Sequence, residues 1–220
     1  MRIRITHRRV TLVLQLILLI EAVLAFAGGR WMVGFLSSFI ILITLIPLFF
    51  ERRFRVYAPP QLQLLAIIFV FATLFLGEVY DYYERFWWWD MALHASSGFL
   101  LGILGFLLVH VMNEIERLDL HMKPGFVAFF AFLFALGVGT VWEIFEFTMD
   151  SVFGMNMQKP MLGDPSGLTD TIWDLIVDAL GALLISVLGY RDLKNRDKET
   201  FLERWLTSFV DRNPRFFVRE

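Results

Sequence analysis

Residues 139–150 read Gly139-Thr-Val-Trp-Glu143-Ile-Phe-Glu146-Phe-Thr-Met-Asp150 and close a long apolar run. The three carboxylates lie at i, i+3 and i+7, a spacing that places them on one face of a helix. The run is apolar enough to span a membrane, where each carboxylate costs about 2.5–3.5 kcal/mol on insertion scales. We therefore expect protons, water or cations to neutralise this face.

The composition is that of a membrane protein. Hydrophobic residues make up 57% of the 220 residues, charged residues only 19%, and the charges cluster between long apolar runs. No face is basic enough to indicate nucleic-acid binding. The absence of cysteine excludes disulfides, thiolate metal sites and thiol nucleophiles. The expected fold is therefore an all-α integral membrane protein.

Six stretches are long enough to cross about 30 Å of hydrocarbon at about 1.5 Å per residue. They are Val10–Ala27, Trp31–Phe50, Leu62–Tyr80, Met91–Met112, Phe126–Met149 and Thr171–Tyr190. The sequence predicts a six-transmembrane-helix bundle over residues 1–190, followed by a cytoplasmic tail over residues 191–220.

The distribution of lysine and arginine predicts the orientation. With both termini inside, seventeen of these residues fall on the cytoplasmic side, and only Arg30, Arg85 and Lys159 fall outside. We therefore expect cytoplasmic N and C termini.

Both ends of the chain carry a further signal. Ala25-Phe26-Ala27 matches a signal-peptidase site, but a multi-pass chain usually keeps its first helix, and we expect retention. In the tail, Thr200-x-x-Glu203 is a capping box before a short amphipathic helix that ends before Pro214. That helix either lies on the inner leaflet or packs on the cytoplasmic loops.

The predicted orientation brings sequence-distant acidic residues to the outer side of the bilayer. They are Glu78 and Asp81 at the end of the third segment, Asp90 and His94 at the start of the fourth, Glu143, Glu146 and Asp150 at the end of the fifth, and Asp170, Asp174 and Asp178 at the start of the sixth, with Glu21 in the outer half of the first. This convergence predicts a shared acidic pocket at the outer membrane face.

Several of these acids have simpler explanations. Asp90 and Asp170 stand where helix N-caps belong, and Thr171-x-x-Asp174 matches a capping box. Glu78, Asp81 and Asp150 are explained equally well as solvated residues at the membrane surface. The four acids that lie one to two turns inside their helices resist such explanations, and Arg85 and Lys159 are too few to pair with them. These four are Glu143, Glu146, Asp174 and Asp178.

His94 is either a core residue bonded to a carbonyl or a functional one. Its i, i+4 spacing from Asp90 suits an oriented base or a metal ligand. The candidate catalytic residues are His94, Asp90 and Glu143, and the candidate metal ligands are Glu143, Glu146, Asp150, Asp170, Asp174 and Asp178.

The simplest interpretation of the remaining motifs is that they serve the fold of the protein. Gly98-x-x-x-Gly102, Gly137, Gly139, Gly181 and Ala182 predict close helix packing. Trp87, Trp88 and Trp89 are typical of an aromatic belt at the membrane interface. The loop of residues 151–169 is either a lid over the acids or an ordinary turn.

The spaced motifs resemble the YjdF-like family of bacterial inner-membrane proteins over roughly residues 75–190. They are Trp89-Asp90-x-x-x-His94-x-x-Ser97-Gly98, Trp142-Glu143-x-x-Glu146-x-x-x-Asp150, Gln158, and Asp170-Thr-x-x-Asp174-x-x-x-Asp178-x-x-Gly181-Ala182. The resemblance implies an inner-membrane protein and names no reaction. The order of the polar residues is more distantly similar to the VanZ-like proteins associated with teicoplanin resistance. Met91 and Asp178 depart from that pattern, and no arginine precedes the last acidic helix.

Three functions fit these observations. The first is a metal-dependent enzyme acting on an envelope lipid or lipid-linked substrate, with Mg, Mn, Ca or Zn as the divalent metal. The second is a proton- or cation-coupled transporter, although the sequence contains no inverted repeat. The third is a non-catalytic envelope scaffold. In each case the partner is the lipid bilayer, and the sequence leaves the oligomeric state open.

Overall fold

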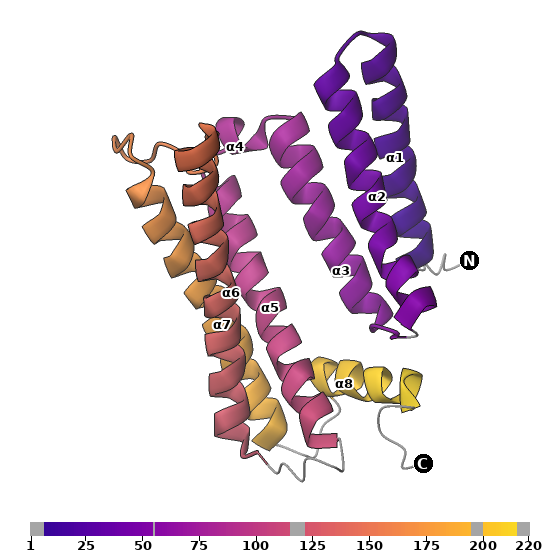
Figure 1. Ribbon diagram of the computed structural model, residues 1–220. Helices are drawn as coiled ribbons and strands as arrows, with labels where there is room; N and C mark the ends of the chain where they lie inside the picture. Colours follow the sequence, from indigo (N-terminus) through magenta and orange to yellow (C-terminus); the bar gives the residue numbers. More distant parts are fainter. Residues whose placement is uncertain (1–6, 55, 115–121, 195–199, 215–220) are drawn as a thin grey trace, which may run out of the picture. The chain divides into compact units, whose positions relative to one another are not determined.

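The computed structural model describes residues 7–54, 56–114, 122–194 and 200–214, and over these residues the chain is all-α, as predicted. The elements are α1 (His7–Ala27), α2 (Trp31–Phe54), α3 (Pro60–Val70), the π-helix η1 (Phe71–Val79), α4 (Tyr82–Arg85), α5 (Trp89–Glu114), α6 (Pro124–Phe153), α7 (Leu168–Lys194) and α8 (Phe201–Arg212) (Figure 1). Each predicted membrane segment coincides with one of these helices, except that the third is divided between α3 and η1.

Several helices are long and apolar enough to cross a membrane. Within the described residues there are five such stretches, namely Arg9–Ala27, Pro60–Val79, Trp89–Met112, Pro124–Phe153 and Leu168–Lys194. The apolar part of α2 found in these residues is shorter, Trp31–Ile46. Multi-pass character therefore agrees with the structure, while the count of six and the cytoplasmic termini stay predictions.

The chain divides into two compact units, which are described separately. Unit 1 comprises Met1–Trp89 and Ser208–Pro214, and unit 2 comprises Asp90–Thr207 and Arg215–Glu220. The predicted boundary at residue 190 lies within α7, which continues to Lys194. The division into a membrane domain and a tail remains a prediction.

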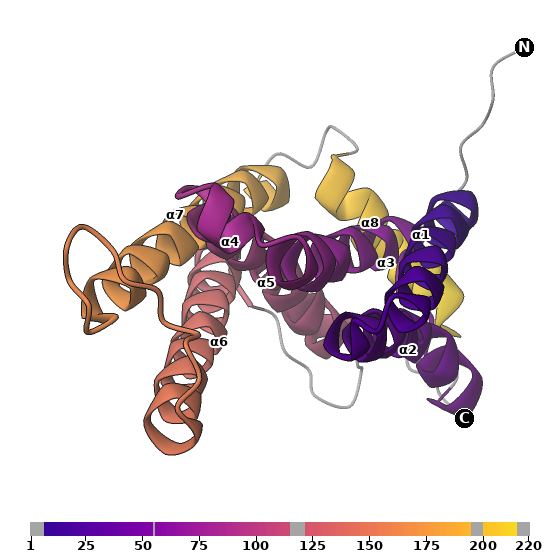
Figure 2. The ribbon, with the colours of Figure 1, turned by 90° about the horizontal axis from the view of Figure 1, so that it is seen from above.

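Unit 1 is built on a pair of apolar helices, α1 and α2, which lie side by side in both views (Figures 1 and 2). Leu18, Ile40 and Phe75 form its buried core. Between the two helices, Gln15 Nε2 donates a hydrogen bond of 3.1 Å to Thr44 Oγ1. Two polar side chains thus satisfy each other inside an otherwise apolar pair.

The third predicted span differs from a regular α-helix. Its second half is the π-helix η1, which places Gly77 against the ring of Tyr83 and ends before Asp81, a residue with a left-handed φ of 57°. A π-helix has a wider turn than an α-helix. The hydrophobic run of this segment is continuous, so periodicity gives no sign of the change.

The end of the chain's last described helix is docked within unit 1. Asn213 Nδ2 donates to Tyr57 O at 2.9 Å, and Asn213 Oδ1 accepts from Tyr57 N at 2.8 Å. Asn213 is buried, and so is Phe209. At its other end α8 is capped by Thr200, whose Oγ1 accepts from Glu203 N, as the capping box predicts. These contacts favour packing on the loops as the role of this helix.

Unit 2 is built on α5, α6 and α7, which lie side by side (Figure 1). Glycines allow their backbones to approach closely: Gly98 of α5 faces the backbone carbonyl of Asp178, and Gly181 of α7 faces that of Ala95. Gly102 and Gly139 also contact α7, as predicted. The prediction of close packing is wrong for Gly137, because a Cβ added there would meet nothing within 4 Å. Its spacing from Gly139 puts it on another face of α6.

Candidate functional site

The start of α5, the end of α6 and the start of α7 meet at one end of unit 2. The contacts of His94 with Glu143 and Asp178 join all three helices, while the predicted shared pocket at the outer membrane face stays a prediction. The loop between α6 and α7 lies at this same end (Figure 1). Glu78, Asp81 and Glu21 belong to unit 1, where Glu78 and Asp81 are exposed.

His94 is the centre of the acidic cluster, which we define as Asp90, His94, Glu143, Glu146, Asp170, Asp174 and Asp178. His94 is 7% exposed. Its Nδ1 lies 3.3 Å from Asp178 Oδ2, within hydrogen-bond distance. Its Nε2 lies 3.7 Å from Asp90 Oδ1 and 3.6 Å from Glu143 Oε1. The second pair of distances exceeds an ordinary hydrogen bond. The imidazole therefore has one bonded nitrogen and one that faces carboxylates across a gap.

Two carboxylates of the cluster are buried without a hydrogen bond. Asp174 is 0% exposed and Glu143 is 3% exposed. Neither oxygen of either side chain has a hydrogen-bond partner. The side chain of Thr171 lies near the Glu143 carboxylate, but it forms no hydrogen bond with either of its oxygens. A buried ionised group without a partner is strongly unfavourable, so these four oxygens require a proton or a cation.

Other acids of the same end hold the loop that joins α6 and α7. Asp150 accepts hydrogen bonds from the backbone amides of Met157 at 2.7 Å and Gln158 at 2.9 Å. Asp170 accepts one from the backbone amide of Lys159 at 2.7 Å. Both oxygens of Asp150 are thus occupied by the loop, whereas Asp170 uses one oxygen.

The same loop segment is fixed at two further points. Gln158 Nε2 donates to Thr171 Oγ1 at 2.7 Å, and Gly167 approaches the side chain of Gln158 closely. Lys159 Nζ donates to the carbonyl of Asn156. Specific hydrogen bonds therefore hold the loop at these helix ends, and whether it acts as a lid stays a prediction.

Helix capping does not explain the acids at the helix starts. Asp90 is the second residue of α5, and Asp170 is the third residue of α7, so neither is an N-cap. Thr171 also lies inside α7, and its predicted capping box with Asp174 is wrong. Asp164 from the loop does the capping, accepting from Thr169 N at 3.1 Å and Ser166 N at 2.9 Å. Because the turn at residues 162–167 ends just before Leu168, α7 begins three residues earlier than the predicted start at Thr171.

Glu146 and Glu21 have partners of their own. Glu146 Oε1 accepts a hydrogen bond of 2.9 Å from Trp142 Nε1, one turn earlier on α6. In unit 1, Glu21 forms an ion pair of 3.1 Å with Arg30. A carboxylate in an apolar helix can therefore be neutralised within the protein, which makes the unpartnered state of Asp174 more informative.

Asp90, His94 and Asp174 lie close enough together that they could hold a metal ion. One ligand atom from each side chain lies within 4.8 Å of the other two. Carboxylate oxygens with one imidazole nitrogen suit a divalent cation. A group of this kind can hold a cation, move a proton, or do both in turn.

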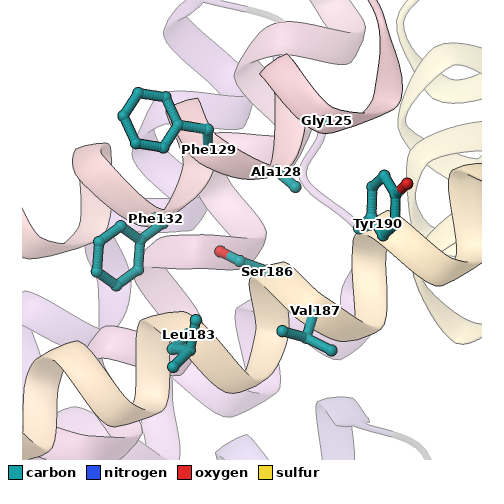
Figure 3. Close-up of a pocket in the computed structure, with 8 residues that line it drawn as sticks. All are labelled: Gly125, Ala128, Phe129, Phe132, Leu183, Ser186, Val187 and Tyr190. Carbon is teal, nitrogen blue, oxygen red and sulfur yellow. The ribbon is translucent and has the colours of Figure 1, made fainter.

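The opposite end of the α6–α7 pair carries an apolar groove of about 400 Å³. It is lined by Gly125, Ala128, Phe129, Phe132, Leu183, Ser186, Val187 and Tyr190 (Figure 3). The hydroxyl of Ser186 points toward α6 in Figure 3, is buried, and has no hydrogen-bond partner. Sequence reasoning gave no sign of this groove, because its residues are ordinary for a membrane helix.

Sequence reasoning also missed the surroundings of Asp178. Ser97 Oγ donates to Asp178 Oδ1 at 2.7 Å, and Gly139 leaves room for the same carboxylate. Ser97 is three residues after His94, so the helical spacing places both on one face. That spacing was the available signal.

Comparisons with known proteins agree with this description. Residues 6–195 match the family described as "Predicted membrane protein (DUF2238)". An uncharacterized protein of Thermotoga maritima is 30% identical over 151 residues, which are 68% of this chain and 72% of that protein. No solved structure matches the chain.

Proposed function

The chain belongs to the DUF2238 family of predicted membrane proteins, and from this premise we propose that it is a metal-dependent enzyme of the bacterial inner membrane. The proposed substrate class is an envelope lipid or lipid-linked compound, and the proposed site is the acidic cluster of unit 2. The observation that carries the proposal is the buried carboxylate of Asp174, which has no hydrogen-bond partner and lies beside Asp90 and His94. The YjdF-like resemblance agrees with this family, and no VanZ-like activity is carried over.

Charge balance supports a cation. The cluster contains six carboxylates, and the basic groups that face them are His94 and Lys159. His94 Nδ1 is already engaged by Asp178, and its Nε2 is too far from Asp90 and Glu143 for hydrogen bonds. Two buried, unpaired carboxylates would cost several kcal/mol, roughly half the stability of an ordinary domain. A divalent cation would remove most of that cost.

The side chains divide into different roles. Asp90, His94 and Asp174 are the proposed ligands, and Glu143 is a further ligand or a general base beside the ion. Glu146, Asp150 and Asp170 have hydrogen bonds that position α6 and the loop, which makes them supporting residues. Mg, Mn, Ca and Zn fit carboxylates, and the imidazole favours Mn or Zn among them. A bound divalent cation supplies an activated water or a contact to a phosphate oxygen.

The topology supports an outer-leaflet substrate. If six helices span the membrane and both termini are cytoplasmic, the start of α5 and the end of α6 face outward. The positive-inside asymmetry supports that orientation, with seventeen basic residues against three. The cluster would then meet lipid headgroups beneath the loop of residues 154–167.

A proton- or cation-coupled transporter is the second candidate, favoured by the position of His94 among carboxylates. Transport needs a path to the other side of the membrane. At the opposite end of α6 and α7, the described residues form an apolar groove with Ser186 as its buried polar group. That lining contains no acid to continue the path, which supports an enzyme; the nearest acid along α7, Asp192, lies outside the lining.

The test begins with metal analysis of the purified protein. We expect about one divalent ion per chain, a melting temperature that EDTA lowers, and loss of both effects in Asp174→Asn. Asp81→Asn is the matched control, because Asp81 is an exposed acid of unit 1 and asparagine tolerates its left-handed backbone. A metal-free wild type whose melting temperature ignores EDTA and added metals would refute the cation site.

A second measurement separates the enzyme from the transporter. Lipids from cells producing the wild type and Asp174→Asn are compared by mass spectrometry. An Asp174-dependent change in a phospholipid or lipid-linked sugar supports the enzyme. Metal binding together with Asp174-dependent cation flux in proteoliposomes, and unchanged lipids, would replace it with transport.

A further inference from the structure

We infer that Asp178 is a positioning residue for His94, holding the imidazole so that Nε2 is presented to Asp90 and Glu143 within the cluster that contains Asp174. The inference rests on the proposed cation site and assigns Asp178 a different role from the neighbouring Asp174. The sequence alone treats these two aspartates alike, since they lie four residues apart on one face of α7.

The two nitrogens of His94 have different partners. Nδ1 is 3.3 Å from Asp178 Oδ2, whereas Nε2 faces Asp90 and Glu143 at 3.7 and 3.6 Å. In the proposed pair Asp178 accepts through its carboxylate and Nδ1 carries the proton, because an ionised carboxylate only accepts hydrogen bonds. The lone pair of the neutral ring is then on Nε2. Metal-binding histidines usually have this arrangement, with the other ring nitrogen bonded to a carboxylate.

The carboxylate of Asp178 is itself fixed in place. Ser97 Oγ donates to Oδ1 at 2.7 Å, while Oδ2 faces His94, so each oxygen has a defined partner. A Cβ at Gly139 would overlap Oδ2, and a Cβ at Gly98 would overlap the backbone carbonyl of Asp178. These glycines let the three helices close around the aspartate.

Asp174 has the opposite environment one turn earlier. It is 0% exposed, Asp178 is 1% exposed, and yet neither oxygen of Asp174 has a hydrogen-bond partner. Burial is therefore equal and hydrogen bonding is not. A ligand needs free oxygens and a positioning residue needs bonded ones, so the geometry assigns the first role to Asp174 and the second to Asp178.

Metal titration distinguishes the two roles. We expect Asp178→Asn to weaken Zn²⁺ or Mn²⁺ affinity about 10–100-fold, the usual effect of losing such a partner, with one ion still bound at saturation. Asp174→Asn should abolish stoichiometric binding. Ser97→Ala should weaken affinity less than Asp178→Asn. Ser96→Ala is the matched control, because its exposed hydroxyl bonds only to the carbonyl of Ala92. Loss of stoichiometric binding in a folded Asp178→Asn protein would make Asp178 a ligand and overturn the inference.

Nitrogen NMR tests the same inference without a metal. The protein is labelled with ¹⁵N-histidine and studied in metal-free detergent solution, at a pH where the ring is neutral. The chain has four histidines, and His94→Gln identifies the relevant signals. We expect the proton of His94 on Nδ1 in the wild type; a proton on Nε2 would overturn the inference. Because this measurement needs no bound metal, its outcome is independent of whether the protein binds a cation.

Discussion

The α6–α7 pair has two ends that handle buried polar atoms differently. At the end of α6 and the start of α7, Asp174 and Glu143 are buried without hydrogen bonds beside His94. At the start of α6 and the end of α7, the groove buries the hydroxyl of Ser186, also without a partner. At the first end both oxygens of two carboxylates thus lack a partner, whereas the groove at the other end leaves only a neutral hydroxyl without one. Near the end of α7, outside the groove lining, one oxygen of Asp192 (Oδ2) is also buried without a partner.

The difference lies in what each end needs from outside the protein. An unpartnered hydroxyl costs about 1–3 kcal/mol, which a stable protein tolerates. An unpartnered carboxylate costs more, and several of them together require a proton or a cation. The acidic end is therefore expected to depend on metal and solution conditions, and the apolar end is not. The following predictions test that contrast.

The largest effect is expected at the helix contact beneath the acidic cluster. A Cβ at Gly181 would overlap the carbonyl of Ala95, so Gly181→Ala must separate the backbones of α5 and α7. Overpacking of this kind typically costs ~3 kcal/mol. We expect a melting temperature several degrees lower, and loss of metal-dependent stabilisation, measured by thermal unfolding in detergent.

Gly137→Ala on α6 is the control for this substitution. A Cβ there would meet nothing within 4 Å, and alanine is favoured over glycine inside a helix by about 0.5–1 kcal/mol. The melting temperature should stay the same or rise slightly. Equal destabilisation by both substitutions would show that glycine flexibility, and not close packing, matters at these positions.

The effect of Asp174→Asn on stability should have opposite signs without and with bound metal. In EDTA the variant should be more stable than the wild type, by up to about 3 kcal/mol, because an amide replaces an uncompensated charge. With saturating metal the wild type should be the more stable, since binding at 1,000 times Kd stabilises by about 4 kcal/mol. Thermal unfolding with and without metal measures both. A variant that is less stable under both conditions would mean that Asp174 has a partner inside the protein.

Much of the fold was predictable from the pattern of apolar residues. All six predicted segments are helical, because a run of about 20 apolar residues leaves helix as the satisfied backbone structure. The π-helix η1 was not predictable, since it lies in a uniformly apolar run where periodicity is uninformative. The starts of α5 and α7 were misjudged as well, because Asp90 and Asp170 have the residue type of a cap without its position.

The site was predictable as a group of residues and not as a set of roles. Antiparallel helices bring the start of α5, the end of α6 and the start of α7 together, and this follows from sequence order. The difference between Asp174 and Asp178 does not, because it depends on a hydroxyl from α5 and a gap at Gly139 of α6. Such differences arise from tertiary contacts that no local spacing encodes.

At the apolar end, Ser186→Ala should have a small effect. Removing a buried hydroxyl without a partner should leave stability unchanged or raise it by about 1 kcal/mol. The change should be the same with EDTA and with metal, measured by the same thermal unfolding. Destabilisation by this variant would instead reveal a bound molecule that hydrogen-bonds to Ser186, and the apolar end would then also depend on a ligand.

The smallest effect is expected in the loop at the acidic end, where the sign of the pH dependence can be worked out. Hydrogen bonds from Ser166 and Thr169 hold the pKa of Asp164 well below its usual range. Because the folded pKa is the lower one, the stabilisation is fully present above the unfolded value of about 3.9 and is lost as the pH falls through the folded value.

The start of α7 should therefore keep its protection between pH 7 and 5 and lose it progressively as the pH falls below about 4. The backbone amides of Ser166 and Thr169 donate hydrogen bonds to Asp164, so their hydrogen-exchange rates report this protection directly. Asp164→Asn is the reference, because its amide does not titrate. The ratio of exchange rates between variant and wild type should be greatest near neutral pH and approach one in acid. A ratio that stays constant as the pH falls well below 4 would show that another group caps this helix. The groove end, where the residues of the lining other than Tyr190 do not titrate, should show no such change over the same range.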